Sequence, residues 1–409
     1  GGSFLRAAGG DGSTATPYRL TDIYGVQGMG SSSTLLGASY RLANDIAAAG
    51  TSGWNGGAGF VPVGADVAPF TGSLDGAGNV ITGLTINRPA TDYVGLIGYA
   101  DSGSSISNLG LVGGSVTGRD YVGSLAGYNH GTITQAYATG AVTGNAYYVG
   151  GLVGFSDGTI TQAYATGAVT GSGYVGGLVG YNNGTITQAY ATGAVTGDVD
   201  VGGLVGLNDH GSITQAYATG AVKGYGTVGG LVAANYGTIT QGYATGAVTG
   251  RANYVGGLVG YNAGSGSITK AYATGAVTGP YEVGGLVAYS DGTITQAYAT
   301  GAVMGTSTST FVGGLVGYSG GTITQAYASG AVMGTSTSTF VGGLVGFSGS
   351  TITSSYWDIG TTGKSAGVGD GSATGVTGLT TTAARSAGSY AAWGFGSVWY
   401  QAGDMRPIL

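Results

Sequence analysis

Apolar residues recur through the middle of the chain in a unit of almost constant sequence. One copy runs from Tyr121 to Gly144 and contains the segment Thr-Ile-Thr, whose isoleucine marks the phase of the repeat. Within each copy, short runs rich in Val, Ile, Thr and Tyr alternate with glycine, which predicts strands joined by tight corners. The isoleucine returns every 26–29 residues, at Ile106, Ile133, Ile160, Ile186, Ile213, Ile239, Ile268, Ile294, Ile323 and Ile352.

A repeat of this length predicts an all-β fold: a parallel β-helix (β-solenoid) of about ten 26–29-residue coils with atypical N- and C-terminal caps, each coil carrying two or three short strands. WD and kelch propellers have longer periods, of about 40–50 residues. The repeats fill residues 93–356. Residues 1–92 are expected to form an N-terminal capping region with the first irregular coils, and residues 357–409 a C-terminal cap, because an open solenoid end would expose unpaired strand edges.

Stacked coils place equivalent side chains above one another in columns. A turn at Gln135-Ala136 would point Ile133 and Val142 into the core and tyrosine toward solvent; without it, Ile133, Gln135 and Tyr137 would share one face. We favour the turn because it buries Val142 with Ile133. The tyrosine column contains Tyr137, Tyr164, Tyr190, Tyr217, Tyr243, Tyr272, Tyr298 and Tyr327, and the glutamine column contains Gln135, Gln162, Gln188, Gln215 and Gln241, followed by Lys270.

The segment from Val149 to Val153 (Val-Gly-Gly-Leu-Val) is apolar on both of its faces. If Leu152 faces the core, Val149 and Val153 face outward, and the same holds in every coil. An outward apolar stripe usually contacts another surface. We therefore expect the stripe to meet a lateral neighbour or a flanking segment of the same chain.

Composition narrows the possible functions mainly by exclusion. The 409 residues include 91 glycines and 29 tyrosines, 42% are apolar, and only 7% are charged, which fits neither collagen nor a disordered chain. The net charge of −6 offers no basic patch for nucleic acid. No apolar run is long enough to span a membrane as a helix. Cysteine is absent, which excludes disulfides, and we expect any signal segment to have been removed before Gly1.

The segment Gly-Gly-Leu-Val-Gly recurs at residues 150–154, 176–180, 202–206, 256–260 and 313–317. It resembles the GLUG motif of filamentous-haemagglutinin-like bacterial exoproteins and surface adhesins. The segments Tyr18–Tyr24, Tyr137–Gly140 and Tyr356–Leu409 are similar to the same family, so the resemblance covers most of residues 18–409. It implies a large secreted or surface-anchored protein of a Gram-negative bacterium that serves adhesion, biofilm or fibres. Because such exoproteins usually begin with a secretion domain that is missing here, we expect a processed or excised portion.

Candidate catalytic chemistry is sparse, and we expect the chain not to be an enzyme. Polysaccharide-cleaving β-helices need clustered carboxylates. His130 and His210, the two histidines of the chain, are expected about 14 Å apart along the stack, too far to share a metal. We therefore expect no cofactor and no metal site. Asp157, Asp209 and Asp291 share one recurring turn, which aspartate suits by hydrogen-bonding its own backbone. The carboxylates of the coils are otherwise scattered, and the full set is Asp157, Asp198, Asp200, Asp209, Glu282 and Asp291.

These observations predict an extracellular or cell-surface protein that forms a rigid rod or a fibre subunit for adhesion or biofilm. Carbohydrate binding, carbohydrate cleavage and ice binding by the outward Thr-x-Thr columns are the alternatives. Expected partners are other copies of the chain and a glycan or host- or cell-surface ligand. The candidate interaction surface combines a variable corner, the tyrosine column and the valine stripe: Arg119, Asp120, Asp198, Asp200, Arg251, Asn253, Tyr137, Tyr164, Tyr190, Tyr217, Val149 and Val153.

Overall fold

The computed structural model describes residues 4–306, 311–335 and 340–409. The chain is an all-β parallel β-solenoid of about 11 turns, with 7% of its residues in helices, which confirms the predicted fold class. Each regular coil contributes strands to four sheets, and in several coils the sheet I segment is divided into two strands by a pair of turn residues; the sequence had predicted two or three strands in each coil. We number the sheets I to IV in the order in which the chain visits them, starting with the Thr-Ile-Thr segment.

The chain divides into two compact units, and unit 1 comprises residues 1–197 and 204–207. Its helices are α1 (Ile23–Gly28), α2 (Ser33–Leu36) and the 3-10 segment η1 (Ala49–Gly57). Sheet I contains β1 (Tyr18–Leu20), β2 (Ser39–Leu42), β3 (Ile46–Ala47), β4 (Ser73–Asp75), β5 (Val80–Thr82), β8 (Ser105–Val112), β11 (Thr132–Ala138), β15 (Thr159–Thr161), β16 (Tyr164–Ala165), β20 (Thr185–Thr187) and β21 (Tyr190–Ala191). Sheet II contains β6 (Thr85–Asn87), β9 (Ser115–Gly118), β12 (Ala141–Gly144), β17 (Val169–Thr170) and β22 (Val195–Gly197); sheet III contains β13 (Val149–Gly150) and β18 (Tyr174–Gly176); sheet IV contains β7 (Ile97–Ala100), β10 (Ala126–Asn129), β14 (Val153–Ser156), β19 (Val179–Asn182) and the first part of β24 (Val205–Asn208).

Unit 2 comprises residues 198–203 and 208–409. Sheet I contains β25 (Ser212–Thr214), β26 (Tyr217–Ala218), β30 (Thr238–Thr240), β31 (Tyr243–Ala244), β35 (Ser267–Ala273), β39 (Thr293–Ala299), β43 (Ile323–Ala328), β47 (Ile352–Thr353), β48 (Ser355–Asp358) and β50 (Val376–Leu379). Sheet II contains β27 (Val222–Gly224), β32 (Val248–Gly250), β36 (Val277–Gly279), β40 (Val303–Gly305) and β44 (Val332–Met333); sheet III contains β23 (Asp200–Gly202), β28 (Thr227–Gly229), β33 (Tyr254–Gly256), β37 (Glu282–Gly284), β41 (Phe311–Gly313) and β45 (Phe340–Gly342). Sheet IV contains β29 (Val232–Asn235), β34 (Val259–Asn262), β38 (Val287–Ser290), β42 (Val316–Ser319), β46 (Val345–Ser348) and β49 (Val368–Gly371), and the helical segments are α3 (Ile359–Thr362), η2 (Ala383–Arg385) and η3 (Ala387–Ser389).

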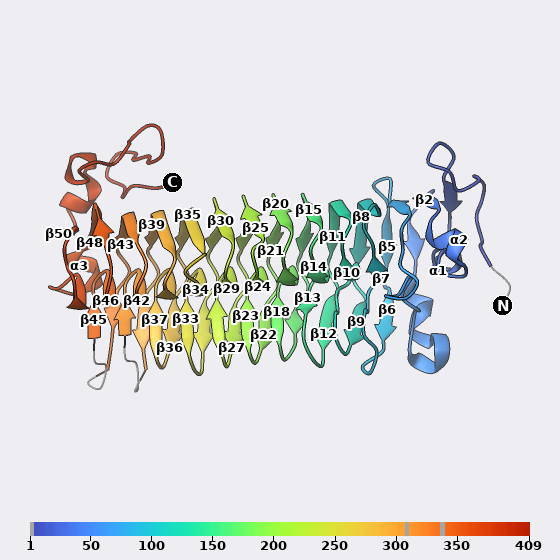
Figure 1. The fold of residues 1–409 in the computed structure, drawn as a ribbon, viewed down its shortest axis with the longest axis horizontal. Helices are drawn as coiled ribbons and strands as arrows, with labels where there is room; N and C mark the ends of the chain where they lie inside the picture. Colours follow the sequence, from blue (N-terminus) through green and yellow to red (C-terminus); the bar gives the residue numbers. More distant parts are fainter. Residues whose placement is uncertain (1–3, 307–310, 336–339) are drawn as a thin grey trace. The chain divides into compact units, whose positions relative to one another are not determined.

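Within each unit the coils stack in register, so that identical residues pair. Ile133 of β11 pairs with Ile160 of β15, and Ile239 of β30 pairs with Ile268 of β35, all in parallel strands. The isoleucine column is buried and forms the core together with the leucine column (Leu152 and its equivalents) and the valine columns (Val142, Val149, Val153 and their equivalents), in which Val341 is half-buried. Figure 1 shows the strands of each unit standing side by side along its axis.

The turn in sheet I is present and decides which side chains face inward. Gln135 has φ of +53°, in the left-handed region, and the alternation restarts after it. Ala136, Ala138 and Val142 are therefore buried with the isoleucine column, whereas Tyr137 is half-buried on the outer surface. The prediction that the tyrosine column faces outward is confirmed. A left-handed residue other than glycine costs roughly 1–2 kcal/mol, so each coil accepts this strain to place tyrosine outside.

The prediction that Val149 and Val153 form an outward stripe is wrong. Both side chains are fully buried, as is Leu152 between them. The prediction carried the two-residue alternation through the glycine pair, but β13 ends at Gly150 and β14 begins only at Val153. The bend between these strands restarts the alternation, so all three apolar side chains point into the core.

A column of buried polar side chains, which the sequence analysis did not identify, lines the core beside sheet IV. In unit 2, the Asn208 side-chain amide donates a hydrogen bond to Asn235 Oδ1 at 2.8 Å, and Asn235 donates to Asn262 Oδ1 at 2.9 Å. Asn235 also donates to the carbonyl oxygen of Gly237 at 3.1 Å. In unit 2 the buried amides thus hydrogen-bond one another, which links successive coils.

Candidate interaction surfaces

The variable corner lies in the loops that join sheet II to sheet III. In unit 1, the Arg119 Nε donates a hydrogen bond to Asp92 Oδ1 at 2.7 Å. In unit 2, Asp198, Arg251 and Asn253 are exposed. Asp200 differs from the rest because it is the first residue of β23 and is only partly exposed. The corner therefore combines exposed side chains with the partly exposed carboxylates of Asp120 and Asp200.

Asp120 and Asp200 are corner carboxylates whose pKa is raised. Burial raises the pKa of the Asp120 carboxyl, although it accepts a hydrogen bond from the Tyr121 backbone N–H at 3.0 Å. Burial also raises the pKa of Asp200, and a hydrogen bond with Thr227 opposes that shift. Both carboxylates are therefore costlier to keep ionised than an exposed aspartate.

The tyrosine column exposes the edges of its rings, because the ring faces stack on one another. In unit 1, the ring centroids of Tyr137 and Tyr164 are 4.7 Å apart with planes 5° apart, and Tyr164 and Tyr190 repeat this geometry. In unit 2, Tyr217 stacks on Tyr243 at 4.8 Å. A sugar ring would need a free aromatic face, so the inner members of the column cannot provide a stacking platform for glycans.

The last part of the tyrosine column in unit 2 is covered by the C-terminal segment, residues 380–409, which folds back over β48, β43 and β39 (Figure 1). The Tyr327 hydroxyl donates a hydrogen bond to the carbonyl oxygen of Pro407 at 2.8 Å, and Trp393 Nε1 donates to the carbonyl oxygen of Ser354 at 2.8 Å. The cluster that results contains Tyr298, Tyr327, Tyr356, Leu379, Ala384, Tyr390, Trp393 and Trp399. The sequence analysis expected a lateral neighbour or a flanking segment of the chain to cover the valine stripe. A flanking segment does cover an outward column, but that column is the tyrosine column.

The C-terminal segment is also held by an ion pair between Asp358 and Arg406, 2.5 Å between Oδ2 and a guanidinium nitrogen. Asp358 is the N-cap of α3, and its Oδ1 accepts hydrogen bonds from the Gly360 and Thr361 backbone N–H groups and from the Thr381 hydroxyl. Burial alone would raise the pKa of Asp358, but the hydrogen bond from Arg406 and those from Thr361 and Thr381 outweigh it and lower the pKa below the ordinary value.

We expect acid to weaken the docking of the C-terminal segment through Asp358. Because the folded-state pKa of Asp358 is lowered, the carboxylate stabilises the docked state above its ordinary pKa of about 4, and this contribution disappears as the pH falls through the folded-state value. Hydrogen exchange of residues 380–409 at pH values from about 5 downward measures the effect. In the Asp358→Asn variant the acid-dependent part should be absent; an equal acid dependence in that variant contradicts the assignment.

Histidine and carboxylate side chains meet in pairs and not in larger groups. His130 Nδ1 lies 2.7 Å from Asp157 Oδ1, and Asp157 Oδ2 accepts a hydrogen bond from the Tyr128 hydroxyl at 2.8 Å. His210 Nδ1 lies 2.7 Å from Asp209 Oδ1. Over residues 4–306, 311–335 and 340–409, no three His, Asp or Glu side chains are grouped so that they could hold a metal ion. These pairs are best understood as contacts that fix the turn before sheet I.

Two outward aromatic columns, on sheets III and IV, were missed by the sequence analysis. On sheet IV of unit 1, Tyr99, Tyr128, Phe155 and Tyr181 stack with centroids 4.4–4.8 Å apart. On sheet III, Tyr121 stacks against Tyr148 at 4.6 Å. For the sheet IV column the signal was present in the sequence, as the aromatic residue two positions after Val153, Val179, Val259, Val287, Val316 and Val345.

Five segments of the chain match the family described as the GLUG motif: residues 118–143, 145–170, 171–196, 197–223 and 251–278. Each segment is about one coil long. It begins near the end of a sheet II strand and ends near the end of the next strand of that sheet, so the motif corresponds to the structural repeat of the solenoid.

None of the helices within the described ranges has the length and apolar character needed to cross a bilayer.

Two curated proteins resemble parts of the chain. A stretch of 141 residues is 43% identical to Halomucin from Haloquadratum walsbyi and covers 33% of this chain but 2% of that protein. A stretch of 81 residues is 38% identical to a glycine-rich protein of Evansella cellulosilytica, provisionally described as a membrane protein, and covers 19% of this chain and 9% of that protein. The chain therefore spans only a small fraction of either relative.

A solved structure from Bacteroides ovatus, of a protein provisionally described as an immunoglobulin A1 protease, aligns with 66% of this chain and 78% of its own chain. The sequence identity is 23% and the TM-score is 0.48. At this level the alignment carries no argument about activity.

Proposed function

We propose that the chain is a structural segment of an extracellular or cell-surface protein, a solenoid that supports adhesion or matrix assembly by associating with other copies of itself. The observation that carries the proposal is the uniformity of the coils. The same buried isoleucine, leucine and valine columns recur through both units, so most coils offer a scaffold and no distinct chemistry. A repeated scaffold of this kind is typical of extended binding and spacing proteins.

The comparisons support this proposal at the level of a structural or surface protein. The GLUG copies coincide with the coils, one relative has a mucin-like name, and the other is described as a membrane protein. The pairing of charged groups agrees with it, because His130, Asp157 and Asp209 are used in contacts at turns. Adhesion to a glycan or to a host or cell surface is part of the proposal.

Electron microscopy of the purified chain over a concentration series tests self-association. The expected result is rods that join into filaments or lateral bundles as the concentration rises. A set of variants with Tyr137, Tyr164 and Tyr190 changed to serine should weaken association if the exposed tyrosine edges make the contact, and Thr159→Ser with Thr185→Ser serves as the control on the same sheet. Separate rods at every concentration, together with no attachment to cells or matrix, would contradict the proposal.

A further inference from the structure

The aromatic columns on sheets III and IV are interrupted in unit 2. On sheet III, Asp200 pairs with Thr227, and Tyr254 of the next coil pairs with Glu282. On sheet IV, Ala234 pairs with Tyr261, so a methyl group stands where the next coil has a ring. The coils that carry Asp200, Thr227 and Ala234 therefore lack aromatic side chains at positions where other coils have them.

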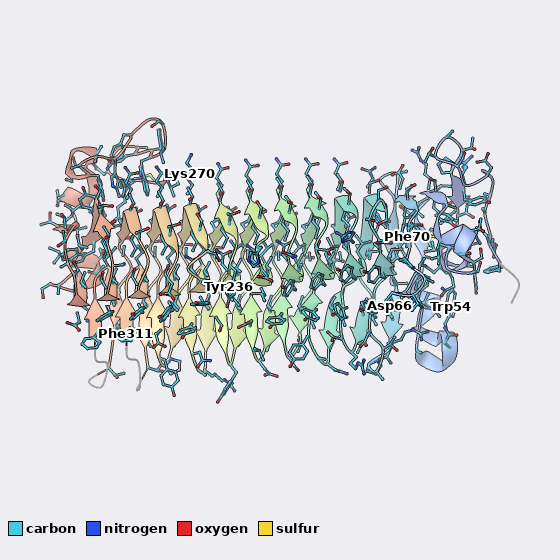
Figure 2. The ribbon with its side chains drawn as sticks, in the orientation of Figure 1. Trp54, Asp66, Phe70, Tyr236, Lys270 and Phe311 are labelled. Carbon is cyan, nitrogen blue, oxygen red and sulfur yellow. The ribbon has the colours of Figure 1, made fainter. Side chains whose placement is uncertain are left out.

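The rings next to this interruption leave the regular stack. Farther along sheet IV, Tyr289 and Tyr318 stack at 4.5 Å with planes 13° apart. Beside the gap, the planes of Tyr261 and Tyr289 differ by 50°, with centroids 5.6 Å apart, and the planes of Tyr254 and Tyr289 differ by 51°. Tyr236, which is labelled in Figure 2, stands edge-on to Tyr261, with ring centroids 5.9 Å apart and planes 71° apart.

Together these side chains line a hollow of about 390 Å³ on unit 2, near the lower limit of small-molecule sites. Its wall combines four tyrosine rings with two carboxylates: Tyr236, Tyr254, Tyr261, Tyr289, Asp200 and Asp291. The rings are inclined to one another, so they do not form the flat platform that a sugar ring would need.

The hollow carries negative charge without a cation to balance it. Asp200 is hydrogen-bonded to Thr227, and Asp291 to the Tyr261 hydroxyl. In the described part of the chain, neither carboxylate forms an ion pair with Lys, Arg or His. Burial, together with the negative charge of Asp291, raises the pKa of Tyr289 to about 12. A cation that enters the hollow would relieve this accumulated negative potential.

We infer that this hollow binds a small organic cation of the quaternary ammonium class, with the tyrosine rings contacting its methyl groups and Asp200 and Asp291 balancing its charge. Cations are attracted to aromatic faces within about 6 Å of the ring centroid, and cages of several aromatic residues are the usual site for quaternary ammonium groups. The inference does not depend on the proposed structural function, since it concerns one place where the repeat is interrupted.

Titration of the full chain with choline chloride at low ionic strength, followed by calorimetry or NMR, tests the inference. We expect saturable binding, and on the order of tenfold weaker binding of the neutral analogue in which a tert-butyl group replaces the trimethylammonium group. Equal affinity for the two compounds, or no binding of choline at millimolar concentration, would overturn the inference.

Variants locate the binding on the hollow. Tyr261→Ala should weaken choline binding on the order of tenfold or more, because this ring contacts the other three aromatic positions. Phe347→Ala, in the same column but away from the hollow, should leave binding unchanged. If Tyr261→Ala disturbs the fold, the isosteric double change of Asp200→Asn with Asp291→Asn provides the same test. Undiminished binding in the correctly folded variants would overturn the assignment of the site.

A binding experiment with lipid vesicles distinguishes the two possible sources of the ammonium group, a lipid headgroup and a soluble cation. Sedimentation of the chain with phosphatidylcholine vesicles, competed by free choline, would assign the site to a lipid headgroup. Binding of free choline without association to vesicles would assign it to a soluble cation. Both results support a quaternary ammonium site at the hollow. If the chain binds neither free choline nor the vesicles, the inference is wrong.

Discussion

Replacing Trp399 by alanine is expected to release the C-terminal segment from the tyrosine column while the coils remain folded. Trp399 is 1% exposed and stacks on Trp393 at 4.0 Å, and its ring lies 6.2 Å from that of Tyr327. Removal of a buried tryptophan costs about 3–5 kcal/mol, which is comparable to the stability of a small docked segment. Hydrogen exchange of residues 380–409 and limited proteolysis measure the release.

A matched control comes from the neighbouring residue. Tyr400 belongs to the same segment but is 61% exposed, so Tyr400→Ala should change the docking free energy by less than about 0.5 kcal/mol. In the Trp399 variant, Tyr298 and Tyr327 should become accessible to solvent. Unchanged exchange of the segment, or loss of all the coils with it, would show that Trp399 does not act as the anchor of a separate docked element.

The repeat and its columns could be predicted because every coil supplies the same information again. The turn at Gln135 could be favoured for a physical reason, since only a turn buries both Ile133 and Val142, and the structure has it. The inward orientation of Val149 and Val153 could not be predicted in this way, because Gly150 and Gly151 are compatible both with a continuing strand and with a bend. Glycine carries no side chain whose burial would distinguish the two.

The remaining features depend on contacts between distant residues. Docking of Trp393 against Ser354 and of Pro407 against Tyr327 brings together residues 39 and 80 positions apart, and no local pattern indicates such contacts. The hollow in unit 2 depends on a missing side chain, because Ala234 stands where a ring would continue the stack. The sequence analysis placed part of the candidate interaction surface at the variable corner, and of the corner residues it named, Asp200 lines the hollow.

The corrected orientation of Val149 leads to a second large expected effect: Val149→Asp should unfold the coils around β13 and β14. The valine is fully buried, and its Cγ2 methyl group lies 2.3 Å from where a Cβ on Gly144 would be and 2.9 Å from where a Cβ on Gly171 would be. A carboxylate there has no room for water and no cationic partner, and burial of such a group costs well over about 4 kcal/mol. Loss of hydrogen-exchange protection in residues 145–182 is the measurement.

Thr170→Asp is the matched control, because Thr170 is a β-branched residue of similar size that is exposed on β17 in the same region of unit 1. Its charge stays in water, so exchange protection should remain within the range of the unchanged chain. The two interpretations of the Val-Gly-Gly-Leu-Val segment give opposite results here. An outward Val149 would make both substitutions harmless, whereas a bend after Gly150 makes only the first one destructive. Equal tolerance of the two changes would therefore mean that the chain passes through the glycine pair without a bend, and that the valine stripe is exposed after all.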